Sequence, residues 1–315
     1  MKALSLIGAA LVLITALPAC AQAPTDTASA QPMGTGPLKA VMIADASLKT
    51  HTLYRPEKLD QLNGAKLPII AWAEGGCANA GNSFRPFLTE IASHGYLVIA
   101  IGPIGPAALE TTRPLAPGQT PPPPRPPEPG AKPKTFSHQL IDAIDWAVAQ
   151  SAQPDSPYFG RLDTAHIAVM GQSCGGLQAI VASSDPRVTT SVIWNSGVLN
   201  DGPGGLPGAE ATKASLGLFH APVAYISGDS RDVAFPNAND DFARINTVPA
   251  WRLYRLGVGH GGTYREPNGG EFGRVAVSWL DWRLKGDQAA GKVFLGDDCG
   301  LCRDPNWKVQ SKNLR

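Results

Sequence analysis

The chain has 315 residues, of which 43% are hydrophobic and 17% charged, and its formal net charge at pH 7 is +1. This length and apolar content allow one large domain with a sizeable buried core. The near-zero net charge gives no electrostatic reason to expect nucleic acid or an acidic surface as a partner, so neither is predicted.

The first twenty residues have the pattern of an export signal. A short positive start is followed by an apolar run over residues 3–17, which is too short to span a membrane. We interpret residues 1–20 as a signal peptide. Residues 17–20 also resemble a bacterial lipobox, in which Cys20 would be lipidated and supply the one predicted membrane contact. The alternative is ordinary cleavage at residues 21–23. We expect an exported protein that is periplasmic, anchored to the outer membrane, or secreted.

Two segments of biased composition follow the signal. Residues 21–37 are rich in Ala, Thr, Pro and Gly and are interpreted as a flexible linker. We expect residues 38–315 to form a single domain with a proline-rich insert at residues 103–134, which includes Pro121 to Pro124. That proline density excludes an ordinary helix and favours an extended, semi-rigid surface loop over a partner-recognition motif.

Elsewhere, short apolar runs alternate with segments of helical period. Strands are expected at residues 39–48, 51–55, 67–73, 96–101, 165–170, 188–194, 221–227 and 251–256. Helices are expected at residues 84–93, 136–152, 175–184 and 271–284. A further helix beyond residue 232 would carry Asp240 and Asp241 on a solvated face. This alternation predicts an α/β protein whose central, mostly parallel sheet is covered by helices on both faces.

Export also affects how the cysteines are interpreted. Outside the cytoplasm thiols tend to pair, so Cys77, Cys174, Cys299 and Cys302 are candidates for two disulfides, with three connectivities open. The Cys299-x-x-Cys302 spacing also occurs in redox motifs. A structural clip is favoured here, because no strand precedes the pair and no helix clearly follows it. No cluster of histidine or further cysteine accompanies these residues, and no metal site is expected.

A strand, a tight turn and a helix are expected around Ser173. Residues 169–179 read VMGQSCGGLQA, and the pattern Gly-x-Ser-x-Gly places Ser173 between Gly171 and Gly175. In a nucleophile elbow the strained turn requires small residues two positions before and after the nucleophile. For Cys174 one of these positions would hold a glutamine, which fits the tightest point of the turn poorly. Ser173 is therefore the predicted nucleophile.

A serine hydroxyl is a weak nucleophile near neutral pH, so it needs a base and an acidic residue that orients the base. In the fold that carries this elbow they follow in the order acid, then histidine. Asp232 follows the strand expected at residues 221–227, with Asp229 as the alternative acid. His260 lies alone in a glycine loop after the strand expected at residues 251–256. The remaining histidines are given structural roles: His51, His94, His138, His166 and His220.

Acyl transfer also needs hydrogen-bond donors for the negative charge that develops on the carbonyl oxygen. One donor of this oxyanion hole is expected to be the N–H of Cys174, at the positive end of the following helix. The second is expected from the loop after residues 67–73, where it is the N–H of either Gly76 or Cys77.

From about residue 67 to residue 284 the chain resembles an α/β-hydrolase, and it is most similar to secreted serine esterases of the dienelactone hydrolase, chlorophyllase and polyester hydrolase-like branch. The resemblance rests on Glu74-Gly75-Gly76, on residues 171–176 (GQSCGG), on Asp232 and on Gly259-His260-Gly261-Gly262. Dienelactone hydrolases carry cysteine at the elbow and polyester hydrolases an aromatic residue in the oxyanion loop, and this chain departs from both. The resemblance implies ester hydrolysis with no metal and no organic cofactor.

Together these features predict an exported serine hydrolase that cleaves small or polymeric carboxylic esters through Ser173, His260 and Asp232. A peptidase or amidase with the same triad is one alternative, and a non-catalytic, surface-anchored binding protein is another. Trp194, at the end of the strand expected at residues 188–194, is the candidate substrate-binding wall. The alternative for Trp194 is an ordinary core tryptophan.

Cys77 and Cys174 lie in the two halves of the expected oxyanion hole. Because the two halves must meet, we predict a Cys77–Cys174 disulfide, with Cys299–Cys302 as the second bridge. Two small buried thiols at positions 77 and 174 are the alternative.

Overall fold

The computed structural model describes residues 34–106, 133–200 and 206–314. The predicted signal peptide, the lipidation site at Cys20, most of the linker and most of the proline-rich insert lie outside these residues. Predictions on those segments stay predictions.

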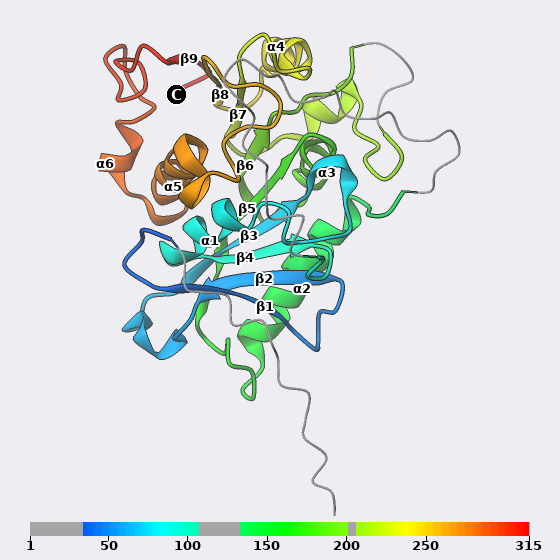
Figure 1. Ribbon diagram of the computed structural model, residues 1–315, viewed down its shortest axis with the longest axis vertical. Coiled ribbons are helices and arrows are strands. Elements are labelled where there is room, and N and C mark those ends of the chain that lie inside the picture. The colour runs from blue at the N-terminus through cyan, green and yellow to red at the C-terminus, as the bar shows by residue number, and fades with distance from the viewer. Residues whose placement is uncertain (1–33, 107–132, 201–205, 315) are drawn as a thin grey trace, which may run out of the picture.

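A nine-stranded sheet runs through the molecule (Figure 1). Its strands are β1 (Ala40–Ala44), β2 (His51–Pro56), β3 (Leu67–Ala73), β4 (Leu97–Ile101), β5 (Leu162–Gln172), β6 (Val188–Trp194), β7 (Val223–Gly228), β8 (Ala250–Arg255) and β9 (Trp307–Lys312). They lie in the spatial order β1-β2-β4-β3-β5-β6-β7-β8-β9. The six strands from β3 to β8 pair in parallel, while β1, β2 and β9 are antiparallel to their neighbours. The predicted α/β class with a mostly parallel sheet is confirmed.

Helices cover both faces of this sheet. The main ones are α1 (Arg85–Ser93), α2 (His138–Ala152), α3 (Cys174–Ala182), α4 (Phe235–Arg244) and α5 (Gly270–Lys285), followed by the short α6 (Gln288–Gly291). Short 3-10 helices occur at Leu59–Leu62, Gly75–Cys77, Lys213–Leu218 and Pro267–Gly269. Figure 1 shows α2 and α5 on opposite sides of the sheet.

The two faces follow from the alternation of side chains along a strand. In β3, Ile69 and Ala71 belong to the core shared with α2 and α3, whereas Ile70 and Trp72 belong to the core shared with α1 and α5. A strand buried on both faces has no polar side, and every residue of β3 is buried. This explains why the parallel strands are continuous apolar runs in the sequence.

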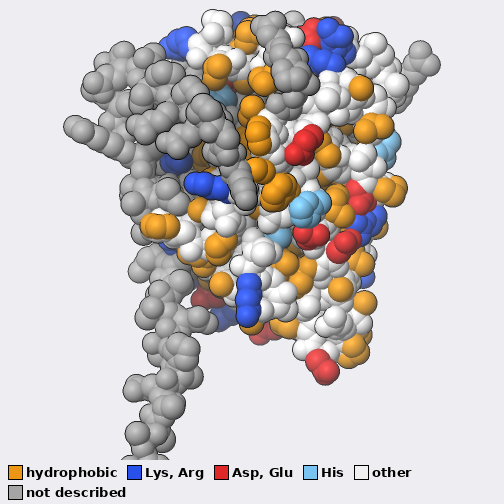
Figure 2. Space-filling view, turned by 90° about the vertical axis from the view of Figure 1, so that its right-hand side faces the viewer, with side chains coloured by type: hydrophobic (Ala, Val, Ile, Leu, Met, Phe, Trp, Pro, Cys, Tyr) orange, Lys and Arg blue, Asp and Glu red, His pale blue; other side chains and the backbone are white. Residues whose placement is uncertain are grey.

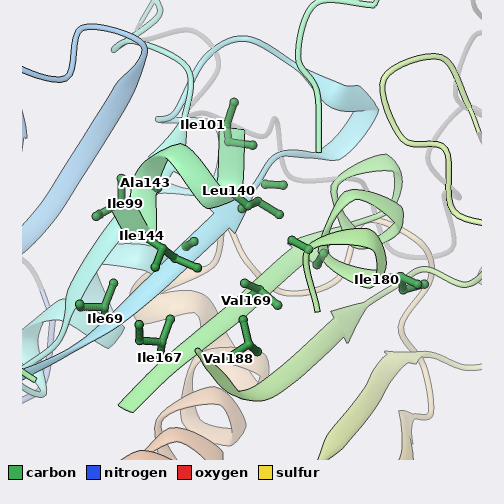
Figure 3. Packing of buried hydrophobic residues seen from close by; sticks show 14 of the residues in the cluster. Ile69, Ile99, Ile101, Leu140, Ala143, Ile144, Ile167, Val169, Ile180 and Val188 are labelled. Carbon is green, nitrogen blue, oxygen red and sulfur yellow. The ribbon is translucent and has the colours of Figure 1, made fainter. Parts of the chain in front are cut away.

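Helix α2 packs by its apolar stripe. Leu140, Ala143 and Ile144 recur at helical spacing, are fully buried, and lie over Ile69 and Ile99 of the sheet (Figure 3). Burying one large aliphatic side chain stabilises a fold by about 1.5–3 kcal/mol, so this contact is a substantial part of the core.

The C-terminal tail is more ordered than the sequence suggested. No strand is predicted after residues 251–256, but β9 pairs with β8 and closes the far edge of the sheet. Trp307 is buried and Val309 packs partly against the same core, two positions apart, as a strand with one covered face requires. The predicted Cys299–Cys302 disulfide is present just before this strand.

The prediction that Asp241 faces solvent is wrong. Its side chain is fully buried and accepts hydrogen bonds from Lys213 Nζ (2.6 Å), the Val198 N–H (2.7 Å) and the Tyr225 hydroxyl (3.2 Å). Burial raises the pKa of this carboxyl, and the bonds from Lys213 and Val198 oppose that effect. The neighbouring Asp240 is more exposed and pairs with Lys213 and Arg244.

The described surface is mixed in charge. On the face shown in Figure 2, Lys and Arg side chains are scattered, and hydrophobic side chains gather near the centre beside a histidine. Among the described residues, none of the helices is both long and apolar enough to cross a membrane.

Candidate active site

Ser173 lies on a sharp turn between β5 and α3. Its backbone has φ 56° and ψ −120°, a conformation that residues with a side chain rarely adopt. The turn is possible because its flanks are glycines. A Cβ on Gly171 would lie 2.2 Å from the Gly175 carbonyl oxygen, and one on Gly175 would lie 2.1 Å from the Ala73 carbonyl oxygen. The structure therefore supplies the steric reason for the Gly-x-Ser-x-Gly pattern.

The structure brings Ser173, His260 and Asp232 together in one hydrogen-bonded chain. Asp232 Oδ1 lies 2.6 Å from His260 Nδ1, and His260 Nε2 lies 2.9 Å from Ser173 Oγ. With Nδ1–H donating to the carboxylate, Nε2 is free to accept the serine proton. Each residue follows a strand of the parallel sheet: Ser173 follows β5, Asp232 follows β7 and His260 follows β8.

Asp232 is built to stay ionised although it is buried. Burial would raise the pKa of this carboxyl, but hydrogen bonds from His260, from the Ala234 N–H (2.9 Å) and from Asn195 Nδ2 (2.8 Å) outweigh it, and the pKa lies below its usual range. An ionised carboxylate can stabilise an imidazolium, which a protonated one cannot.

Asp229, the alternative acid, has different partners. It forms a two-bond salt bridge with Arg231 (2.9 and 2.7 Å) and accepts the Gly257 N–H (2.8 Å). The bond from Arg231 lowers the pKa of Asp229 to about 2. This side chain joins the loop after β7 to Gly257 in the loop after β8, and among the described residues no hydrogen bond links it to His260.

A disulfide joins Cys77 and Cys174, as predicted. Cys174 is the first residue of α3, so its N–H has no partner within the helix. Cys77 ends the turn after β3, where Gly76 and Cys77 have φ of 63° and 47°. The Thr135 hydroxyl also donates to the Cys77 carbonyl oxygen (3.0 Å). The two loops expected to supply oxyanion donors are thus covalently linked, and the choice between the Gly76 and Cys77 amides stays open.

A pocket of about 700 Å³ opens onto Ser173 and His260. Its described lining is mostly apolar or backbone, and Lys134 is its single lysine or arginine. The lining residues are Gly75, Gly76, Cys77, Ala78, Pro133, Lys134, Ser173, Cys174, Leu177, Asn195, Ser196, Gly197, Leu199, Leu206, Pro207, Val233, Ala234, Asn237 and His260. A concave, largely apolar cavity with a few convergent polar groups is the usual form of a small-molecule site.

The prediction that Trp194 forms a substrate wall is wrong. Its side chain is fully buried, and its ring lies 5.3 Å from Phe87 and 5.4 Å from Phe272. Trp194 is the last residue of β6, and the alternation along that strand points it toward α1 and α5, away from the pocket. The next residue, Asn195, lines the pocket instead.

Glu74 is a buried carboxyl directly before the Gly75–Cys77 turn. It is 1% exposed, and neither carboxylate oxygen has a hydrogen-bond partner among the described residues. Burial raises the pKa of Glu74 to about 8, and the nearby Trp72 indole and the charge of Arg265 offset only part of that effect. The side chain is therefore neutral at neutral pH.

Sequence reasoning missed the residues that hold the triad. Asn195 Nδ2 bonds Asp232, Ser196 Oγ donates to the Ser173 carbonyl oxygen (2.6 Å), and Gln172 Nε2 donates to the His260 carbonyl oxygen (3.0 Å). One signal could have found two of them. Asn195 and Ser196 directly follow a parallel strand, at the sheet edge where the carboxyl ends of the strands converge.

In the described part of the chain, no three His, Cys, Asp or Glu side chains are grouped as metal ligands would be. Neither the models of known protein families nor the curated proteins give a match to this chain.

We expect Gly175→Ala to destabilise the protein by about 1–3 kcal/mol, because its Cβ would overlap the backbone of β3. Gly217→Ala is the matched control, since a Cβ there meets nothing within 4 Å. Urea unfolding of both variants measures the difference. Equal losses of stability would contradict the packing described for the elbow.

We expect Glu74→Gln to change how stability depends on pH. Between pH 4.5, the ordinary value, and about 8, the folded protein keeps a proton that the unfolded chain has released. Wild-type stability therefore falls as the pH rises through this window and levels off above it. Gln does not titrate, so the unfolding free energy of the variant lacks this pH dependence. The difference in unfolding free energy, variant minus wild type, should therefore increase by at most about 5 kcal/mol as the pH rises through this window.

Urea unfolding at several pH values tests this. The exposed Glu57→Gln is the control and should follow the wild type throughout. A constant difference between Glu74→Gln and the wild type from pH 5 to pH 8 would show that Glu74 is already ionised in the folded protein.

The two disulfides should differ in their contribution to stability. Cys77 and Cys174 are 97 residues apart, whereas Cys299 and Cys302 are 3 apart. A cross-link that closes a loop of about 100 residues is worth up to about 4.7 kcal/mol of chain entropy, and shorter loops are worth less. The double variant Cys77→Ala/Cys174→Ala should therefore unfold at clearly lower urea than Cys299→Ala/Cys302→Ala. The reverse order would be inconsistent with this account.

Proposed function

We propose that this protein is a serine hydrolase that cleaves carboxylic esters. The observation that carries the proposal is the hydrogen-bonded chain Asp232–His260–Ser173, which ends on a strained serine at the wall of a largely apolar pocket. A nucleophile, a base within hydrogen-bond distance and a group that orients the base are the parts that covalent acyl transfer requires.

In the first step, Ser173 Oγ attacks the ester carbonyl carbon and His260 Nε2 takes the serine proton. The carbonyl π pair moves onto oxygen, and Asp232 stabilises the imidazolium and holds its tautomer. When the tetrahedral intermediate collapses, the C–O bond to the alcohol breaks and the proton on Nε2 goes to the departing alcohol. The products of this step are a free alcohol and an ester of Ser173.

In the second step, water attacks the acyl-enzyme. His260 Nε2 takes a proton from the water and returns it to Ser173 Oγ as the acid is released. In both steps the negatively charged carbonyl oxygen would accept hydrogen bonds from the Cys174 N–H and from the N–H of either Gly76 or Cys77. Removing one such donor costs about 10²–10³ in turnover, so the disulfide that sets their spacing matters for the rate.

The pocket favours a substrate with apolar groups on either side of the ester. Leu177, Leu199, Leu206 and Val233 contribute apolar surface, and the described lining contains no carboxylate. This suits small or polymeric esters with uncharged acyl groups and gives no particular reason for a peptide backbone.

The α/β-hydrolase family is the one we propose for the chain. Support comes from the strand–turn–helix at Ser173, from the order Ser173, Asp232, His260, and from the turn after β3 that meets the start of α3. We also propose that the protein is exported, since disulfides persist in oxidising compartments. Lipidation at Cys20 and the extent of the signal peptide remain predictions from the sequence.

We expect Ser173→Ala to lower kcat for p-nitrophenyl butyrate hydrolysis by about 10⁵–10⁶-fold, because it removes the nucleophile. The variant should also lose labelling by a fluorophosphonate probe. Ser184→Ala, at an exposed serine after α3, is the matched control and should keep both.

Three results would count against the proposal. Ester hydrolysis retained by Ser173→Ala would exclude this serine as nucleophile. An absence of both labelling and hydrolysis in the wild type would favour a binding protein. Faster cleavage of p-nitroanilides than of the matching esters would make the protein an amidase or peptidase.

A further inference from the structure

The three residues 194–196 at the end of β6 contact Ser173, Asp232 and Gly259, the residue before His260. The Trp194 carbonyl oxygen accepts the Ser173 N–H (3.0 Å), and Ser196 Oγ donates to the Ser173 carbonyl oxygen. Asn195 Nδ2 donates to Asp232 Oδ2 (2.8 Å) and, at 3.3 Å, to the carbonyl oxygen of Gly259, the neighbour of His260.

Asn195 is the partner that fixes the Asp232 carboxylate from behind. Asp232 Oδ1 already has two donors, His260 and the Ala234 N–H, whereas among the described residues Asn195 Nδ2 is the one donor to Oδ2. Asn195 is fully buried and has a φ of 41°, a conformation that asparagine tolerates better than most residues. A carboxylate held at both oxygens cannot rotate away from the imidazole.

The Tyr264 hydroxyl determines which end of the Asn195 amide faces Asp232. It donates to Asn195 Oδ1, while the two acceptors, Asp232 Oδ2 and the Gly259 carbonyl, lie at the NH₂ end. If the amide were turned over, its oxygen would face the carboxylate, and two acceptors would repel each other. Tyr264 therefore keeps the donor end of the amide on Asp232.

Tyr264 is held in turn by a buried aromatic cluster. Its ring lies 4.8 Å from Phe84, 5.2 Å from Phe87 and 5.2 Å from Phe272, and it is fully buried. Trp194 belongs to the same cluster, 6.0 Å from Tyr264. The hydroxyl is thus placed by rigid packing on the α1 and α5 side of the sheet, and this packing gives Trp194 a role in support of the site.

We propose that Asn195 and Tyr264 are positioning residues of the triad: the Tyr264 hydroxyl orients the Asn195 amide, and the amide orients Asp232 toward His260. This inference rests on the proposed function for its kinetic consequences. In this role neither residue acts on the substrate directly. Tyr264 acts through its hydrogen bond to Asn195, and Asn195 acts through its hydrogen bond to Asp232.

The first test is Tyr264→Phe, which keeps the ring and removes only the hydroxyl. We expect kcat for p-nitrophenyl butyrate to fall about tenfold, the effect of about 1.4 kcal/mol of lost stabilisation, with KM changed by less than about twofold. Tyr96→Phe is the matched control. That ring is also fully buried, and its hydroxyl donates to a carboxylate that is not part of the triad, Asp281 of α5 (2.7 Å). It should lose stability but keep kcat.

The second test is a double-mutant cycle with Asn195→Gly, because glycine accepts the positive φ of Asn195. If Tyr264 acts only through Asn195, adding Tyr264→Phe to Asn195→Gly should lower kcat no further. Independent, multiplicative losses in the double variant would overturn the proposed order of action. If Tyr264→Phe alone folds poorly, Asn195→Gly by itself still tests the proposal: it should lower kcat with little change in KM, and an unchanged kcat would overturn the role of Asn195.

A third measurement does not depend on turnover. The proton on His260 Nδ1 should give a downfield NMR resonance that reports its hydrogen bond to Asp232. We expect Tyr264→Phe to shift or broaden this signal and Tyr96→Phe to leave it unchanged. An unchanged resonance in Tyr264→Phe would overturn the positioning role. A wild type that shows the resonance but no ester hydrolysis would instead overturn the proposed function.

Discussion

The parallel pairing of β3 to β8 is the constraint on which the site depends. Because those strands point the same way, their carboxyl ends meet at one edge of the sheet, and the residues that follow them converge there. Ser173, Asp232 and His260 come from three different strands and meet within hydrogen-bond distance for this reason. The turn after β3 and the residues after β6 reach the same edge, so Cys77 and the Asn195 amide lie near the triad for the same reason.

Much of this arrangement could be predicted from the sequence. The sequence predicts the strand at residues 67–73 with the bounds that the structure shows, because a strand buried on both faces is a continuous apolar run. The elbow was identified because its steric demand is local and allows only small residues at two positions. The acid and the histidine followed from chain order and from their place after strands. The first strand was expected as far as residue 48 but ends at Ala44, where a turn closed by the Leu48 N–H and the Asp45 carbonyl begins.

What the sequence could not give is the environment of single side chains. The sequence predicts Asp241 as a solvent-facing charge on a helix. In the structure its buried carboxylate accepts hydrogen bonds from Lys213 and Tyr225, which lie in other elements of the chain. The place of Trp194 at the end of β6 predicts that it lines the pocket. The direction of a side chain depends on register, however, and a shift of one residue moves it to the other face of the sheet. Strand β9 was missed because it is an edge strand with only one covered face, and only Trp307 and Val309 mark it as a strand.

The disulfide between Cys77 and Cys174 forms only after the chain has been made and has met an oxidant. Thiols stay reduced in the cytosol, so a newly made chain has no covalent link between the turn after β3 and the start of α3. Among the bonds described here, the turn at Cys77 is then held at its carbonyl by the Thr135 hydroxyl. The two sides of the pocket are locked together only when an oxidant reaches the folded or folding protein. A chain kept in a reducing compartment is thus an unfinished form of the same molecule, and its maturation is a chemical step distinct from folding.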